Sequence, residues 1–507
     1  RITRLLPEKQ RSAEPDWHRA SCNDHTRIMT DTLDRTARDY SVVGPEAQRA
    51  AEVGLVDAEW FRPYVDPGRM RELTERTNRR AIADAVLWLG FLTGVGVAAA
   101  VVFPSYWSIP LFVVYGALFG AADARWHEFG HGTACSNERV NGAMYQLASL
   151  MLWRGPTLWR WSHFRHHSDT IIVGRDPEIQ LARPPSLLRL AQNYSGLRNQ
   201  PVMFWRIVQH AVGNIDPVAL DLVPANERNK VVWEARFSVV VHAAVIALAV
   251  ATQSWLPILL VGAPTMYGAW LVLFFGTTQH LGLQEDVLDH RANSRTVYMN
   301  PVFRFLYLNM NYHVEHHIFP TVPYYRLPAL HAEIKHALPE PSPNCLHAYR
   351  EIIGELRRQR DDPNHELETR LIPDVPNAPA EAGSIGLIRP DGSFDLGPVE
   401  QISIGSITRV DVRDRTFAVA RIDDGTVCVV DGTCTHGQVH LAGGAVVDGP
   451  DGPQIECPKH NGRFDLATGA PCRKPVKEPI AVYAVDTASG HIIIQPPAGR
   501  PTKRDMT

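Results

Sequence analysis

Histidines at helical spacing are the residues of this sequence best suited to chemistry. Segments 163–167 and 313–317 each place histidines at i, i+3 and i+4, and segment 127–131 places two at i, i+4. In a helix, residues three and four apart lie on one face, and imidazole is the commonest metal ligand. The spacing therefore predicts a metal centre, with surface histidines on amphipathic helices as the alternative. The candidate ligands are His127, His131, His163, His166, His167, His313, His316 and His317.

A second set of candidate ligands lies nearer the carboxyl end. It consists of two pairs, Cys434 with His436 and Cys457 with His460, each in a glycine-containing turn between expected strands. Zinc held by two cysteines and two histidines is one interpretation. The motif more closely resembles the Rieske [2Fe–2S] domain, in which two cysteines hold one iron and two histidines hold the other. The resemblance implies that all four residues bind the cluster, in a domain of the soluble ferredoxin type.

The second site bears on the choice of metal in the first. The segment 127–131 also matches the HExxH signature of zinc proteases. Zinc has no second oxidation state for an electron donor to use, whereas imidazole also suits copper, iron and nickel. An electron donor in the same chain is useful only to a redox-active centre. Because reductive activation of O2 needs more than one electron, we expect a pair of irons.

Two long uncharged stretches frame the histidine segments. Residues 85–122 and 237–284 contain no Asp, Glu, Lys or Arg. A membrane helix needs about 20 apolar residues, so each stretch predicts a helical hairpin, with spans near 81–103, 107–122, 237–252 and 256–277. Arg and Lys flank only the side away from the hairpin tips, which places both termini and the loop 123–235 in the cytoplasm. All histidine segments, and His280 after the fourth span, then share one cytoplasmic cap.

The three histidine motifs, their order and the paired spans resemble the membrane fatty-acid desaturase superfamily. This superfamily includes acyl desaturases, alkyl hydroxylases and carotenoid ketolases. The resemblance covers about residues 79–334 and is closest to bacterial hydrocarbon oxygenases of the rhizopine-catabolism type. It implies two non-haem iron ions, O2 as co-substrate, the eight histidines as iron ligands and His280 as a ninth. Asp176 and Glu178 are candidates to orient ligand imidazoles, with ion pairs to Arg165 or Arg175 as the alternative.

The sequence predicts a multidomain fold. Residues 1–40 are expected to be a disordered N-terminal segment, 41–360 a membrane di-iron domain, 361–400 a linker and 401–500 a Rieske domain. The membrane domain is α-helical, with four transmembrane helices and a cytoplasmic helical cap, and the Rieske domain is small and all-β. Residues 1–28 contain no apolar signal region, and we expect Met29 to be the natural start. A net charge of −3 gives no indication of nucleic-acid binding, and the seven scattered cysteines indicate a reducing compartment.

Together these features predict an O2-dependent di-iron oxidoreductase in the bacterial inner membrane, multi-pass, with cap and Rieske domain cytoplasmic. The leading hypothesis is hydroxylation of a C–H bond of a lipid or small organic substrate, which gives oxidative dealkylation when the bond is next to oxygen or nitrogen. Acyl-lipid desaturation is the runner-up, and a membrane-anchored electron carrier is a non-enzymatic alternative. Because the chain shows no dinucleotide or flavin fingerprint, the expected partner is a separate NAD(P)H-dependent flavin ferredoxin reductase.

Several other histidines are not expected to bind metal. His290, His331 and His336 lack cluster spacing. His242 lies inside the third predicted span, where a packed, hydrogen-bonded histidine is the favoured interpretation, although ionisable groups in membrane spans are often functional.

Overall fold

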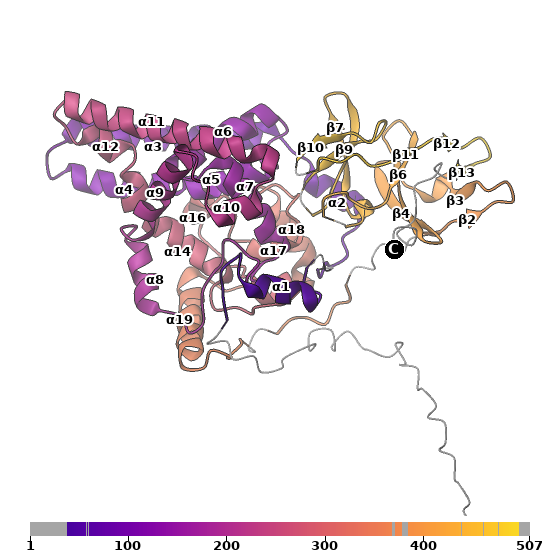
Figure 1. Cartoon of the computed structure of the whole chain (residues 1–507), viewed down its shortest axis with the longest axis horizontal. Helices are drawn as coiled ribbons and strands as arrows, with labels where there is room; N and C mark the ends of the chain where they lie inside the picture. The colour runs from indigo at the N-terminus through magenta and orange to yellow at the C-terminus, as the bar shows by residue number, and fades with distance from the viewer. Residues whose placement is uncertain are drawn as a thin grey trace, which may run out of the picture.

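Long apolar helices and short alternating strands divide the chain into a helical part, up to Asp361, and a β part, from Ser384 (Figure 1). The computed structural model describes residues 38–495, except 57, 59, 368–370, 378–383, 438, 460 and 475. Nearly all of the predicted disordered segment 1–40, the expected start at Met29 and the candidate ligand His460 lie outside the described residues.

Two helices form the first apolar hairpin, α3 (Asn78–Val102) and α4 (Ser108–Gly120), after the short helices α1 (Pro45–Glu52) and α2 (Pro67–Thr74). The inner face of α3 carries mostly small residues, among them Ala81, Ala85, Gly96 and Ala99. Its outer face exposes large apolar side chains, among them Val86, Phe91, Val97 and Val101. Small residues between helices and large apolar residues outside are typical of helices that pack within a membrane.

The second hairpin departs from the prediction. Its first arm is one helix, α11 (Arg228–Ala251), but the expected span 256–277 is broken into α12 (Leu256–Leu260), α13 (Pro264–Tyr267) and α14 (Ala269–His280). Gly262 adopts a φ of +96° and Pro264 lacks an amide hydrogen, so one continuous helix cannot form there. Four continuous spans are therefore not observed. Among the described residues, two helical stretches are long and apolar enough to cross a membrane, Gly68–Val102 and Ala225–Ala251.

Short helices at the ends of the hairpins build the cap. The histidine segments lie on α5 (Ala122–His131), α7 (Pro156–Ser168), the end of α14 and α17 (His313–Ile318). The other helices are α6 (Glu138–Met151), α8 (Leu187–Tyr194), α9 (Asn199–Ala211), α10 (Pro217–Leu222), η2 (Ala225–Glu227), α15 (His290–Asn293), α16 (Pro301–Leu306), α18 (Leu327–Ile334), η3 (Lys335–Ala337) and α19 (Cys345–Asp361). One hydrophobic core contains Trp126 and Phe129 of α5 together with Val314 and Ile318 of α17. This core holds the two helices in place relative to each other.

The β part is built from three sheets within the described residues. The largest has the order β1 (Ser384–Ile385), β4 (Ser406–Val412), β5 (Arg415–Arg421), β6 (Val427–Asp431) and β11 (Val482–Tyr483). The second has the order β10 (Pro471–Arg473), β9 (Arg463–Asp465), β8 (Gly452–Glu456) and β7 (Ala445–Gly449). The third has the order β12 (Val485–Asp486), β13 (His491–Ile494), β3 (Phe394–Pro398) and β2 (Leu387–Ile388). Two short 3-10 turns are η4 (Val399–Gln401) and η5 (Leu441–Gly443).

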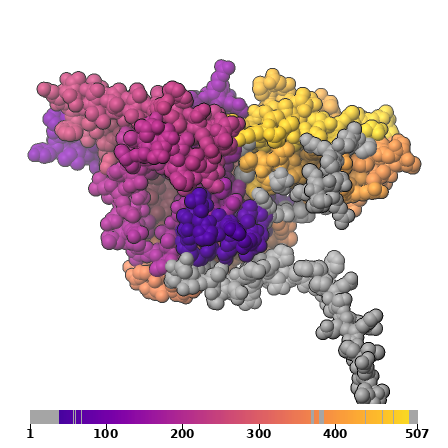
Figure 2. All heavy atoms as spheres, in the orientation of Figure 1, coloured from indigo at the N-terminus to yellow at the C-terminus, as the bar shows by residue number. Residues whose placement is uncertain are grey.

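The β part begins earlier than its sequence suggests. Strands β1 to β3 lie inside 361–400, the segment expected to be a linker, because Ser384 and Ile385 pair with β4 and Phe394 pairs with β13. In space, the apolar helices α3, α4, α11 and α12 lie at one end of the molecule and the β part at the other (Figure 1). Figure 2 shows the β part packed directly against the helical part.

Candidate metal centre

The nine predicted histidines meet inside the cap in two groups. Atoms of the first group lie within 4.8 Å of one another and belong to His127, His131, His163, His167 and His316. Atoms of the second group do the same and belong to His166, His280, His313 and His317. None of the nine is more than 8% exposed. The alternative of surface histidines is therefore wrong.

Ring nitrogens in these groups point at one another. The Nε2 of His163 lies 3.0 Å from that of His131 and 3.2 Å from those of His127 and His167. A neutral imidazole has one N–H donor and one acceptor nitrogen, so one proton cannot satisfy three facing nitrogens. A metal cation placed between them can accept a lone pair from each of the three nitrogens. The donor set of both groups thus fits a pair of metal ions.

The protonation state of the histidines suits metal binding. Burial lowers the pKa of seven of them well below the usual range, and neighbouring imidazoles lower it further; they are His127, His131, His167, His280, His313, His316 and His317. Neutral imidazole is the form that binds a metal. Burial also acts to lower the pKa of His166, but the carboxylate of Asp176 outweighs it and raises that pKa.

Neighbouring oxygen atoms set the orientation of three of these rings. Asp176 Oδ2 lies 2.9 Å from His166 Nδ1, and Glu178 Oε2 lies 3.2 Å from His163 Nδ1. His280 Nδ1 lies 2.8 Å from the carbonyl oxygen of Asn293. In each ring, the Nε2 atom is left facing its group. Such partners hold metal-binding imidazoles in position and set their tautomer.

The alternative in which Asp176 and Glu178 pair with Arg165 or Arg175 is not what the structure shows. Arg175 contacts Asp169 at 2.9 Å, and Arg165 contacts Asp221 at 3.5 Å. His242, inside α11, accepts a hydrogen bond from Trp153 Nε1 at 2.8 Å, and its Nδ1 lies 2.7 Å from the Ser238 carbonyl oxygen. It is a packed, hydrogen-bonded residue, as predicted.

Sequence spacing misses two buried histidines close to the centre, His290 and His331. His290 stacks on Trp60 with ring centroids 4.1 Å apart and lies 5.0 Å from the ring of His317; burial lowers its pKa to about 3. His331 contacts the carboxylate of Glu315, which also accepts a hydrogen bond from Thr296 at 2.5 Å. This contact fixes α17 from the side opposite its ligand face.

A further buried residue beside the centre is Glu128, which lies between the two histidines of α5. Its carboxylate is fully buried, and burial raises its pKa to about 8. One carboxylate oxygen lies 3.6 Å from His316 Nδ1. The HExxH pattern marks this glutamate, but its proximity to His316 follows only from the fold.

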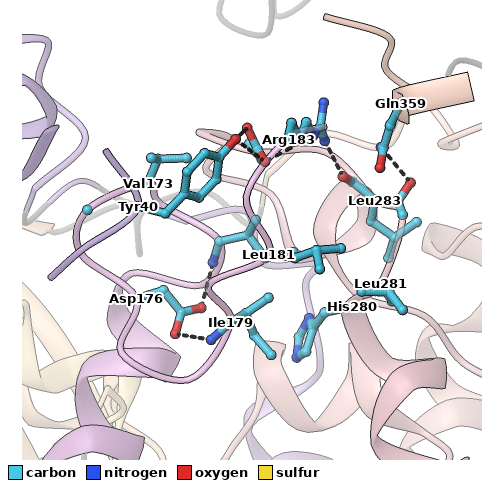
Figure 3. A pocket seen from close by; sticks show the side chains of 14 residues that line it. Tyr40, Val173, Asp176, Ile179, Leu181, Arg183, His280, Leu281, Leu283 and Gln359 are labelled. Atoms are coloured by element: carbon cyan, nitrogen blue, oxygen red, sulfur yellow. Dashed lines mark hydrogen bonds and ion pairs between the residues drawn. The ribbon is translucent and has the colours of Figure 1, made fainter. Parts of the chain in front are cut away.

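A small cavity reaches the four-histidine group at His280 (Figure 3). Its volume of about 30 Å³ has room for one or two water molecules. Tyr40 and Arg183 close one end, where the Tyr40 hydroxyl donates to Glu285 at 3.1 Å and Arg183 pairs with the same carboxylate at 2.9 Å. Asp176 lines the cavity as well, so the cavity touches His280 and the carboxylate partner of His166.

Two tight loops in the β part bring Cys434 and Cys457 together. The Cys434 amide donates to the Val439 carbonyl at 2.9 Å, and the Cys457 amide donates to the Gly462 carbonyl at 2.7 Å. Both thiols are buried, and their mutual hydrogen bond lowers the pKa of Cys434 to about 7. Thiolate is the form that binds metal. His436 lies on the first loop and is exposed, whereas His460 lies outside the described residues.

Comparison with known proteins identifies both parts. Residues 104–349 match the family described as fatty acid desaturase, and residues 393–484 match the Rieske [2Fe-2S] domain. Ferredoxin CarAc of Metapseudomonas resinovorans is 37% identical over 91 residues, which are 18% of this chain and 80% of the relative. The ferredoxin component of the naphthalene 1,2-dioxygenase system of Pseudomonas aeruginosa is 32% identical over 101 residues, 20% of this chain and 92% of the relative.

Solved structures include the ferredoxin of Sphingomonas yanoikuyae B1. It is 38% identical to this chain, and the match covers 20% of this chain and 97% of the ferredoxin, with a TM-score of 0.19.

The chain contains a fatty acid desaturase domain at residues 104–349 and a Rieske [2Fe–2S] domain at residues 393–484. Its cofactors are a di-iron site, which the desaturase domain and its histidine groups imply, and a [2Fe–2S] cluster, which the Rieske domain implies. It is an O2-dependent di-iron oxidoreductase, and the predictions of enzyme class and cofactors are confirmed. The zinc interpretations of both motifs are wrong.

Proposed function

We propose that this protein is a membrane-bound oxygenase that hydroxylates a C–H bond of a lipid or small organic substrate, using electrons from its own Rieske domain. The meeting of nine buried histidines in two adjacent groups is the observation that supports the proposal most directly. A one-electron donor that packs on the same cap supports it further. When the bond lies next to oxygen or nitrogen, hydroxylation leads to oxidative dealkylation.

We assign one iron to each histidine group. The first iron would be held by His127, His131, His163, His167 and His316, and the second by His166, His280, His313 and His317. The [2Fe–2S] cluster would be held by Cys434, His436, Cys457 and His460. The first group would thus supply five imidazoles and the second four.

The di-iron centre, when loaded, supplies the reductive activation of O2. The residues around it hold the imidazoles, exclude bulk water and hold or release protons. Hydroxylation consumes O2, two electrons and two protons, and one oxygen atom leaves as water. The cavity beside His280 gives water a place next to the four-histidine group, and Asp176 connects that cavity to His166 through the bond at 2.9 Å.

We place the enzyme in the bacterial inner membrane as a multi-pass protein with cap and Rieske domain on the cytoplasmic side. The exposed apolar faces of α3 and α11 support a bilayer location, since soluble proteins rarely expose large contiguous apolar patches. In this arrangement the broken segment α12–α14 completes the second hairpin. Within the chain we propose residues 41–360 as the oxygenase unit. We further propose a separate NAD(P)H-dependent flavin reductase as the source of electrons for the Rieske cluster.

The proposal can be tested with 18O2. Iron-loaded protein is supplied with NAD(P)H, a ferredoxin reductase and lipid or small organic substrates, and the products are analysed by mass spectrometry. We expect 18O in a hydroxylated product and two irons beyond those of the Rieske cluster. An unlabelled alkene would instead support acyl-lipid desaturation. Cluster reduction without substrate-dependent O2 uptake would support an electron carrier.

A matched variant separates the two metal sites. His313→Ala removes one candidate ligand of the four-histidine group and leaves the Rieske loops unchanged. We expect product formation to be lost while the electron paramagnetic resonance signal of the reduced Rieske cluster persists. A variant with full activity would contradict the ligand assignment.

A further inference from the structure

The Rieske domain packs on the cap with its cluster loops facing the histidine groups. The ring of His436, on the first loop, lies 6.0 Å from the ring of Trp161 in α7. The carbonyl oxygen of Pro458, on the second loop, accepts a hydrogen bond from Arg62 at 3.4 Å. The guanidinium of Arg473, at the end of β10, donates to the carbonyl oxygen of His131. Three separate contacts therefore orient the cluster end of the domain toward the cap.

Each of these contacts reaches a candidate iron ligand or a residue close to one. Trp161 is two residues before His163, and His131 is itself a candidate ligand. Arg62 also donates to the carbonyl oxygen of Ile318 at 3.3 Å, directly after His317. The interface thus connects the two cluster loops and the end of β10 to all three histidine motifs.

Ion pairs across the interface hold this orientation. The buried carboxylate of Glu456 contacts Arg76 of the helical part at 2.5 Å and Arg463 of its own domain at 2.7 Å. Lys474 pairs with Glu227, and Arg71 pairs with Asp423 at 2.5 Å. Because the Glu456–Arg76 pair is buried, its separation would leave an unpaired charge in the interface. The ion pairs favour one docked geometry over a loosely tethered domain.

The indole of Trp161 lies in the interface between the two parts. Its Nε1 donates to Glu227 Oε2 at 3.4 Å, and Lys477 Nζ lies 5.3 Å from the ring centroid. Glu227 and Lys477 come from opposite sides of the interface, so both parts of the molecule fix the ring. Its neighbour across the interface is His436, and its own helix carries His163, His166 and His167.

We infer that this interface is the path by which electrons pass from the Rieske cluster to the iron pair, and that the ring of Trp161 lies on this path. The inference rests on the proposed function and adds the route that the electrons take within the chain. In each transfer the cluster is oxidised by one electron and one ferric ion of the pair is reduced by one. The NAD(P)H-dependent reductase restores the cluster between transfers. Electron transfer slows steeply with the gap between donor and acceptor, so a ring that contacts His436 and lies on the helix of three candidate iron ligands should affect the rate.

The test measures the transfer and the docking separately in the full-length, iron-loaded chain. The cluster is reduced chemically and then mixed with O2 and substrate, and its reoxidation is followed by absorbance and electron paramagnetic resonance. Hydrogen–deuterium exchange of segments 127–132 and 456–463 reports whether the domain stays docked. The variants are Trp161→Leu and Trp161→Phe. Trp205→Leu is the control, because Trp205 lies on α9 and is 60% exposed.

We expect Trp161→Leu to reoxidise its cluster severalfold more slowly than the wild type, with exchange protection and cluster potential unchanged. Trp161→Phe, which keeps an aromatic ring, should show a smaller decrease in the reoxidation rate. Trp205→Leu should reoxidise its cluster at the wild-type rate. Reoxidation of Trp161→Leu at the wild-type rate would overturn the inference. If Trp161→Leu is slow but has also lost exchange protection, Trp161 acts only by docking the domain, and its place on the electron path is overturned.

Failure of the proposed function gives a different result from failure of this inference. If the protein is not a di-iron oxygenase, the wild type itself will lack the additional irons or will not reoxidise its cluster with substrate. If only the inference fails, the wild type will reoxidise its cluster and Trp161→Leu will do so equally fast.

Discussion

At the scale of single residues, the candidate centre depends on which nitrogen of each imidazole faces inward. Asp176, Glu178 and the carbonyl of Asn293 each contact an Nδ1 atom and leave Nε2 facing a histidine group. A carboxylate partner also makes its imidazole a stronger metal ligand. Asp176 should therefore affect metal affinity although it is not itself a ligand. The pKa of His166, raised by Asp176 against the effect of burial, reflects this interaction.

Asp176→Asn tests this role. The substitution keeps the size of the side chain but removes the charge opposite His166, so the four-histidine group should bind iron more weakly. Loss of such a partner typically costs about 10–100-fold in metal affinity. The measurement is a competition titration with a chelator, followed by iron analysis.

Asp169→Asn is the matched control for that experiment. Asp169 is equally buried and lies in the same loop, but it pairs with Arg175 at 2.9 Å. It should retain wild-type iron affinity. If both variants lose iron alike, the effect belongs to the loop and not to the bond between Asp176 and His166.

Local spacing explains which residues of the centre the sequence could reveal. The eight motif histidines are three or four residues apart, and helix geometry alone places each set on one face. His290 and His331 have no such partners nearby in the chain. They reach the centre through contacts with Trp60 and Glu315, which only the tertiary fold creates. His280 also lacks local spacing; the expected topology places it in the cap, and the family resemblance adds its role as a ligand.

At the scale of elements, the length of the two uncharged stretches predicts the two hairpins but not the break in the second. Hydropathy treats glycine and proline within an apolar run as ordinary members of it, although Gly262 and Pro264 prevent a continuous helix there. The break has a packing consequence. A Cβ atom on Gly268, at the start of α14, would lie 2.2 Å from the carbonyl oxygen of Gly116 in α4. The two backbones therefore meet where only glycine fits.

Gly268→Ala should push α4 and α14 apart. We expect it to destabilise the protein by about 1–3 kcal/mol, as overpacking does, and to lower iron occupancy, because α14 ends at His280. Thermal unfolding in detergent and iron analysis measure both effects. Gly276→Ala is the control: it lies in the same helix, and a Cβ atom there would meet nothing within 4 Å. Equal losses in both variants would show that the contact with Gly116 is not the cause.

At the scale of the whole molecule, the docking of the two domains is what the sequence does not reveal. A linker between two domains predicts only that they stay near each other. The docked arrangement depends on Arg76, Glu456 and Arg473, which lie far apart in the chain and carry no motif. Charged residues of this kind are ordinarily read as solvated surface, and their burial follows from the meeting of two surfaces.

Glu456 gives this docking a defined pH dependence. Burial alone would raise the pKa of its carboxyl group, but Arg76, Arg463 and Arg473 outweigh burial and lower it from the ordinary 4.5 to about 2. A carboxyl group with a depressed folded pKa stabilises the docked state fully above its ordinary value. That contribution fades as the pH falls from about 4.5 toward 2, because the carboxylate must then be protonated.

Glu456→Gln isolates this contribution from the other carboxylates that titrate in the same range. Removing one partner of a buried ion pair costs about 3–5 kcal/mol, so the variant should unfold more easily at neutral pH. The difference in unfolding free energy between wild type and variant should be constant above pH 4.5 and shrink on further acidification, measured by urea titration at each pH. Asp423→Asn, which disrupts an exposed pair, should cost at most about 1 kcal/mol. A difference between wild type and Glu456→Gln that grows as the pH falls would show that the guanidinium groups do not hold Glu456 ionised.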